Sequence, residues 1–141
     1  MNGRAMALDV GDKRIGVALS DPTGMLASGL KTVHRTHLKD DIAEFVALIA
    51  EHAVHTIVVG WPLETSGRVG RQARRVKIVT DALAAEAEVP IVFWDERFTS
   101  VQAERVLIQG GVRRAARRQV VDKVAATLIL QSWLDNQKMA T

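Results

Sequence analysis

The spacing of apolar residues changes about one third of the way along the chain, and this change limits the possible folds more than any other feature of the sequence. Apolar and small residues alternate along residues 4–10 and 15–19, which predicts two strands. The segment from Gly11 to Arg14 predicts a tight turn between them. Residues 29–35 resemble a third strand. Because the connections are short, we expect these three strands to pair antiparallel.

Helices and strands alternate in the remainder of the chain. The pattern predicts a helix within 39–53, a strand at 55–61, a helix over 73–87, a strand at 91–94, a helix from Thr99 to Gly110 and a last helix from about Gln119 to Leu134. Strands that helices separate should be parallel, through right-handed crossovers. We therefore expect an α/β, ribonuclease H-like fold: a mixed five-stranded sheet, three strands antiparallel and then two parallel, flanked by helices. With no linker or repeat, residues 1–141 are expected to form one domain.

An acidic residue interrupts the first predicted strand. Alternation places Asp9 on the same face as Ala5 and Ala7, which are small and leave room beside the carboxylate. Burying a carboxylate without a partner costs more than burying an apolar side chain. Asp9 could bond to nearby backbone amides or pair with Lys13 or Arg14, or it could have a chemical role.

Acidic residues occupy two further unusual positions. Asp95 and Glu96 end the last predicted strand, where α/β proteins collect ligand-binding groups, although either could serve only the next helix or pair with Arg97. Asp122 lies in the last predicted helix, either as a surface acid beside Lys123 or facing inward. The inward alternative follows from its helical spacing to Ala125, Ala126, Ile129 and Trp133.

Together these acids predict a metal site. Neighbouring carboxylates repel unless a cation joins them, and hard divalent cations prefer oxygen ligands. We therefore expect Mg²⁺ or Mn²⁺ at Asp9, Asp122 and one of Asp95 and Glu96. Two such ions can activate a water and stabilise the leaving oxygen of a phosphoryl displacement. A phosphodiester is the substrate that this chemistry predicts.

Basic residues gather in the second half of the chain. Residues 68–118 hold eleven of the nineteen basic residues but six of the sixteen acidic ones, which predicts either a surface for a polyanion or a solvated face without a ligand. Residues 110–119 are expected to be an arginine-rich loop. With three Phe, three Trp and no Tyr, we expect contacts to the phosphate backbone more than base stacking. The candidate nucleic-acid-binding residues are Lys13, Arg14, Arg71, Arg74, Arg75, Arg97, Arg113, Arg114, Arg117 and Arg118.

Four segments, in this order and over nearly the whole chain, resemble the YqgF family, also called RuvX, of Holliday junction resolvases. They are ALDVGDKRIGVALSDP, IVVGWPLETSGRVG, FWDERFTS and VDKVAATLILQ. The resemblance implies a fold related to the RuvC resolvases and a metal-dependent nuclease. It implies two candidate substrates: the precursor of the small-subunit ribosomal RNA, trimmed at its 5′ end, and branched DNA.

The same resemblance assigns the catalytic and metal-binding acids. By motif these are Asp9, Glu96 and Asp122, and Asp95 could take the place of Glu96. The second segment departs from the family pattern, because Ser66 stands where an acidic residue is more frequent.

Two other functions remain open. The chain could be a nucleic-acid-binding factor for ribosome assembly or RNA processing with little catalysis. An ATPase of the actin superfamily is disfavoured, because 141 residues supply one of the two domains that close around a nucleotide. A resolvase that makes two symmetric cuts predicts a homodimer, whereas end trimming needs one site. Without cysteines, a signal-like segment or a membrane-spanning run, we expect a cytoplasmic protein with no membrane contact.

Overall fold

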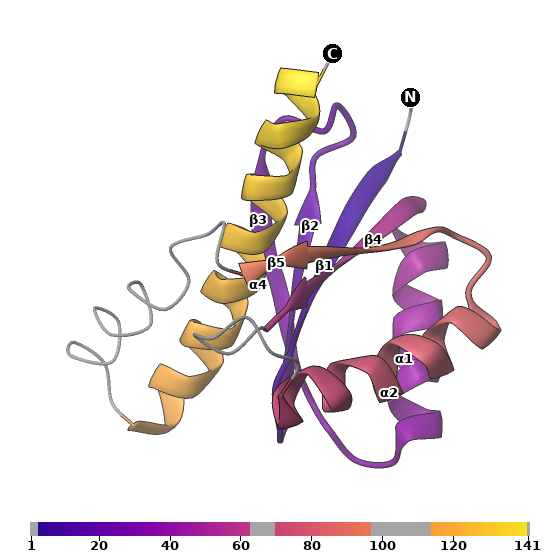
Figure 1. Ribbon diagram of the computed structural model, residues 1–141, viewed down its shortest axis with the longest axis vertical. Coiled ribbons are helices and arrows are strands. Elements are labelled where there is room, and N and C mark those ends of the chain that lie inside the picture. The colour runs from indigo at the N-terminus through magenta and orange to yellow at the C-terminus, as the bar shows by residue number, and fades with distance from the viewer. Residues whose placement is uncertain (1–2, 63–69, 97–113, 141) are drawn as a thin grey trace.

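The computed structural model contains one mixed sheet of five strands (Figure 1). It describes residues 3–62, 70–96 and 114–140, the last range with side chains from Lys123 to Met139. The strands are β1 (Arg4–Val10), β2 (Arg14–Ser20), β3 (Ala27–His34), β4 (Val54–Trp61) and β5 (Ile91–Asp95), in the order β3-β2-β1-β4-β5. β1, β2 and β3 pair antiparallel, and β4 is parallel to both β1 and β5. The predicted mixed sheet is confirmed.

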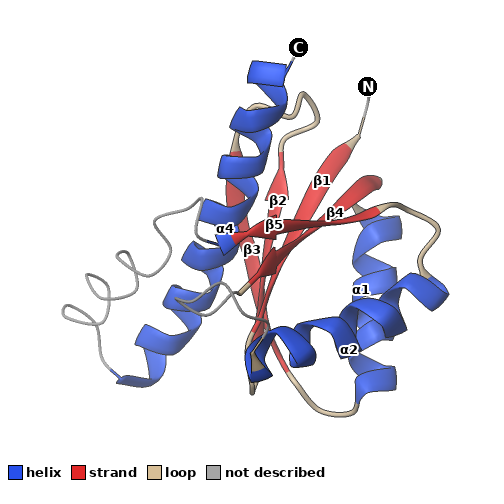
Figure 2. Ribbon diagram, in the orientation of Figure 1, coloured by secondary structure: helices blue, strands red, loops and turns tan. Residues whose placement is uncertain are grey.

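Helices cover both faces of the sheet (Figure 2). α1 (Leu38–Glu51) and α2 (Arg71–Glu86) pack on one face, and α4 (Arg114–Ala140) crosses the other. Alternation along β1 explains the two layers, because Met6 and Leu8 are buried in the core under α1 and α2. Ala5 and Ala7 are buried under α4, where their small side chains let the long helix approach the strands closely. No described helix is both long and apolar enough to cross a membrane.

The last helix differs from its prediction. We expected it from about Gln119 to Leu134, with an arginine-rich loop over 110–119, but α4 begins at Arg114 and continues to Ala140. Arginine and alanine are strong helix formers, and neither glycine nor proline interrupts this segment. Arg114, Arg117 and Arg118 therefore belong to a helix. The third predicted helix, from Thr99 to Gly110, lies outside the described residues.

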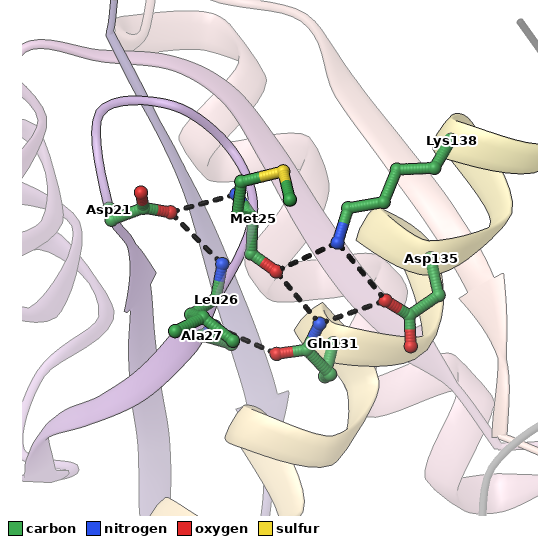
Figure 3. Close-up of polar contacts among 7 residues, drawn as sticks. All are labelled: Asp21, Met25, Leu26, Ala27, Gln131, Asp135 and Lys138. Carbon is green, nitrogen blue, oxygen red and sulfur yellow. Dashed lines mark hydrogen bonds and ion pairs between the residues drawn. The ribbon is translucent and has the colours of Figure 1, made fainter.

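Asp21 organises the connection between β2 and β3 (Figure 3). Its Oδ1 accepts hydrogen bonds from the backbone N–H groups of Met25 at 2.8 Å and Leu26 at 3.0 Å, and its Oδ2 accepts one from the Thr23 hydroxyl. These bonds, the one from Leu26 first, hold the pKa of the Asp21 carboxyl well below its usual range. The loop is thus built around an ionised side chain.

The end of α4 is fastened to the same loop (Figure 3). The Gln131 side chain accepts a hydrogen bond from Ala27 N–H at 2.9 Å and donates to the Met25 carbonyl at 3.1 Å and to Asp135 at 3.0 Å. Lys138 Nζ also donates to the Met25 carbonyl, at 3.0 Å. These contacts fix the direction in which α4 crosses the sheet.

Candidate functional site

Asp9 lies near the carboxyl end of β1 with glycines on both sides. The residue is 5% exposed. It pairs with Gly16 of β2, and since Leu8 pairs with Val59 of β4, the next pair in that register is Asp9 and Gly60. Alternation places Asp9 on the face of the sheet that α4 covers. The Asp9 side chain therefore has no neighbouring Cβ atom in either adjacent strand, and glycine backbone flanks it on both sides.

Glu96 reaches back over β4 toward this position. Its Oε1 lies 3.1 Å from the point that a Cβ atom on Gly60 would occupy, and Cδ1 of Ile129 in α4 lies 2.6 Å from the same point. Val58, two residues before Gly60, is buried in the core under α4, so this point is on the α4 face. Neighbouring strands are about 4.8 Å apart. The structure thus brings the Glu96 carboxylate to the same face as Asp9, one strand away.

Asp95 occupies the opposite face. It is the last residue of β5 and pairs with Trp61. Trp94 packs against the core under α4, where its Nε1 donates a hydrogen bond to the Ser132 hydroxyl at 2.9 Å. Because side chains alternate along a strand, Asp95 projects away from α4 and from Asp9. Glu96, which follows the strand, is the acid that the fold places near Asp9.

Asp122 lies in α4, and its side chain is outside the described part of the structure. Its backbone position is three and four residues before Ala125 and Ala126 and seven before Ile129, all buried against the sheet. Positions at these spacings share one face of a helix. The predicted approach of Asp122 to Asp9 remains a prediction.

Oxygen is the donor type that the described site offers. Within residues 3–62, 70–96 and 123–139, no three histidine or acidic side chains gather as a metal-binding group. The described site contains the carboxylates of Asp9 and Glu96. Two carboxylates fit a hard divalent cation better than a soft one.

The predicted basic residues divide into separate groups. Lys13 and Arg14 lie at the turn from β1 to β2, and Arg75 of α2 joins them around one open pocket. Arg71 and Arg74 lie in the first turn of α2, and both are exposed. Arg114, Arg117 and Arg118 lie in the first turns of α4, whereas Arg97 and Arg113 are outside the described residues.

Sequence reasoning missed Arg35, which lines the same pocket as Arg75. Arg35 follows β3 and is far from the turn in sequence, but the pairing of Arg14 with His34 brings it alongside. The antiparallel arrangement of the first strands was the signal that could have identified it.

Known proteins resemble the chain along most of its length. A family model described as RuvX, Holliday junction resolvase, matches residues 3–136. A Clostridium novyi (strain NT) protein named "Putative pre-16S rRNA nuclease" is 46% identical over 133 residues, covering 94% of this chain and 98% of the relative. A Moorella thermoacetica protein of the same name is 48% identical over 132 residues, covering 94% of each chain.

Solved structures share the fold at low sequence identity. Thermus thermophilus RuvC in complex with a Holliday junction substrate has a TM-score of 0.63 at 13% identity, with 96% of each chain covered. The fowlpox virus Holliday junction resolvase has a TM-score of 0.53 at 10% identity, with 94% of this chain and 99% of that chain covered. At these identities the similarity shows the fold alone, and it confirms the predicted ribonuclease H-like architecture.

Proposed function

Because the chain belongs to the RuvX family of Holliday junction resolvases, we propose that it is a nuclease that hydrolyses phosphodiester bonds in the precursor of 16S ribosomal RNA. The choice of this RNA is supported by the names of relatives that are 46% and 48% identical over 94% of the chain. We infer that the cut matures the 5′ end of the RNA. Such a substrate would place the protein in the cytoplasm.

The position of Asp9 is the observation that carries a catalytic function. Asp9 is buried between Gly16 and Gly60, and the Glu96 carboxylate lies over Gly60 on the same face. A purely structural acid would not need a glycine on each side or a second carboxylate nearby. This arrangement supports Asp9 and Glu96 as catalytic residues.

Mg²⁺ or Mn²⁺ fits these donors, and Asp9, Glu96 and Asp122 would hold it. The carboxylate oxygens of Asp9 and Glu96, on the same face of the sheet, support a hard cation. When bound, the cation would activate a water and stabilise the leaving oxygen at phosphorus. The strands would hold Asp9 and Glu96 in place and α4 would hold Asp122, and the basic side chains nearby would position the phosphate backbone.

Cleavage assays test the proposed function directly. A labelled RNA that spans the 5′ end of the mature 16S sequence is incubated with Mg²⁺ or Mn²⁺ and with wild type, Asp9→Asn, Glu96→Gln or Asp122→Asn. Wild type should cut, and each substitution should abolish cutting while RNA binding is retained. Asp95→Asn is the matched control and should still cut. Binding by wild type without any cutting would instead indicate an assembly or processing factor with little catalysis.

Branched DNA is a second candidate substrate, favoured by the description of the family model. A junction resolvase makes two symmetric cuts and needs two active sites, so this function predicts a homodimer. The solution mass of the protein, measured with and without a four-way junction, tests it. A dimer on the junction with paired cuts would support resolution, whereas a monomer that cuts RNA alone would support end trimming.

A further inference from the structure

An open basic pocket of about 590 Å³ lies at the end of β1, next to the candidate catalytic site. Its lining consists of Asp12, Lys13, Arg14, His34, Arg35, Thr36 and Arg75. Four of these residues are cations at neutral pH, and one is a carboxylate. We call this feature the basic pocket. Because positive charges predominate among its lining residues, the basic pocket would favour an anion as its ligand.

Backbone contacts hold one wall of the basic pocket in place. Arg35 N–H donates to the Lys13 carbonyl at 2.9 Å. The Arg35 side chain donates through Nη1 to the carbonyl of Gly11 at 3.0 Å and to that of Asp12 at 3.4 Å. Arg35 therefore orders the turn that carries Lys13, with its guanidinium at the pocket wall.

α2 supplies the other wall. Gln72 donates to the Val10 carbonyl at 2.7 Å, which fastens the start of α2 to the end of β1. Arg75, one turn further along, lies 3.4 Å from the Gln72 side-chain oxygen and 3.6 Å from Oδ1 of Asp12. The two walls come from distant segments, yet their charges converge on one space.

The Asp12 carboxylate does not neutralise the charges of Lys13, Arg35 and Arg75 in this pocket. The Asp12 side chain is 65% exposed, and it approaches Arg75 at 3.6 Å, so solvent screens the pair strongly. An anion with several oxygen atoms would offset the repulsion among the cations. Guanidinium groups match phosphate oxygens by paired hydrogen bonds, and lysine adds a point charge.

The basic pocket lies close to Asp9 in sequence, beyond the carboxyl end of β1. Asp12 follows Asp9 by three residues, which span at most about 11 Å. Asp9 is on the α4 face, whereas Arg75 belongs to α2 on the opposite face (Figure 2). A nucleic-acid strand that crosses the end of β1 would meet both places.

We propose that the basic pocket binds a backbone phosphate of the substrate strand, a few nucleotides from the bond that is cut at Asp9. This inference rests on the proposed function, because it assumes that the substrate is a nucleic acid. The phosphate could be internal to the strand or a terminal 5′ monophosphate. Both have the oxygen chemistry that Lys13, Arg35 and Arg75 would recognise.

Binding without catalysis tests the inference. Fluorescence anisotropy is measured in EDTA over a series of salt concentrations, with 3′-labelled single-stranded RNA that carries a 5′ phosphate or a 5′ hydroxyl. Lys13→Gln and Arg75→Gln remove surface charges and leave the turn held by Arg35. Arg4→Gln is the matched control, because Arg4 starts β1 and so lies at the other end of that strand from the basic pocket.

Each pocket variant should weaken binding about tenfold at low salt, the effect of losing one charge-assisted hydrogen bond. Each should also reduce the slope of log affinity against log salt by about 0.7, the value for one lost phosphate contact on a single strand. Arg4→Gln should change neither quantity. If the pocket variants lose affinity only for the 5′-phosphate RNA, the pocket binds a terminal phosphate. If they lose affinity equally for both RNAs, the pocket binds an internal phosphate.

The outcomes separate this inference from the proposed function. If Lys13→Gln and Arg75→Gln bind as Arg4→Gln does, the inference is wrong, and cleavage by wild type is unaffected by that result. If the pocket variants lose affinity but wild type does not cut, the pocket stands and the proposed nuclease activity is wrong. If wild type binds neither RNA, both are wrong.

Discussion

The Glu96 carboxylate lies over Gly60, with Oε1 3.1 Å from the position of a Cβ atom on residue 60. Gly60→Ala would place a methyl group at this point, where it also meets Ile129 Cδ1 at 2.6 Å. We expect the Glu96 carboxylate to shift, and a misplacement of about 1 Å can lower a rate about 100-fold. Overpacking should also lower the free energy of unfolding, by about 1–3 kcal/mol. Cleavage rate and urea denaturation measure the two effects.

A double variant separates the two effects of Gly60→Ala. Ile129→Val removes the Cδ1 atom and so relieves one of the two close contacts. Gly60→Ala with Ile129→Val should regain much of the lost stability while cleavage stays slow, because the methyl group still lies against Glu96. A double variant that cuts as fast as Ile129→Val alone would show that the lack of a side chain at residue 60 has no role in positioning Glu96.

Divalent cation should stabilise the folded protein through Asp9. A ligand that binds only the native state at 100 times its dissociation constant adds about 2.7 kcal/mol to the free energy of unfolding. We therefore expect Mn²⁺ to raise the Tm of wild type by several degrees. Asp9→Asn should remove this shift, and Asp95→Asn, whose side chain projects to the opposite face, should keep it. Equal shifts in wild type and Asp9→Asn would exclude Asp9 as a ligand.

Local patterns predicted most of the fold. The alternation in Arg4–Val10 matches the bounds of β1, because larger residues on one buried face alternate with small ones on the other and a tight turn to β2 follows. α4 was predicted too short, since its basic first turns carry no apolar stripe and resemble a loop. Helix propensity, and not amphipathic spacing, indicates the true start at Arg114.

The site was harder to predict than the fold. The motif assigned Glu96 but left Asp95 as its alternative, because the choice depends on which face β5 presents to α4. The burial of Trp94 against α4 supports Glu96, and it is a tertiary contact that local patterns do not reveal. Arg35 was missed for a similar reason, since strand pairing brings it to Lys13 from 22 residues away in sequence. The approach of Asp122 to Asp9 remains to be tested.

Gln131 should contribute more to the free energy of unfolding than Gln137, a second glutamine of α4. Its side chain joins the β2–β3 connection to the helix by bonds to Ala27, Met25 and Asp135. Gln131→Met preserves the length of the side chain but leaves the Ala27 N–H without this acceptor, which should cost about 1–3 kcal/mol. Gln137→Met, at an exposed position of the same helix, should change stability little. Equal urea midpoints for the two variants would contradict the assigned role.

The ionised Asp21 makes the same loop sensitive to acid. Hydrogen bonds from Leu26, Thr23 and Met25 hold the pKa of the folded carboxyl well below its usual range, whereas an unfolded aspartate titrates at about pH 3.9. Above that pH the side chain is ionised in both states and its stabilisation is complete. Below about pH 3.9 the unfolded chain takes up a proton that the folded chain does not. The free energy of unfolding therefore decreases as the pH is lowered. Asp21→Asn lacks this titration. As the pH is lowered from 7 to about 3, the difference in urea midpoint between wild type and Asp21→Asn should therefore shrink. A difference that stays constant over this range would show that the charge of Asp21 does not stabilise the loop.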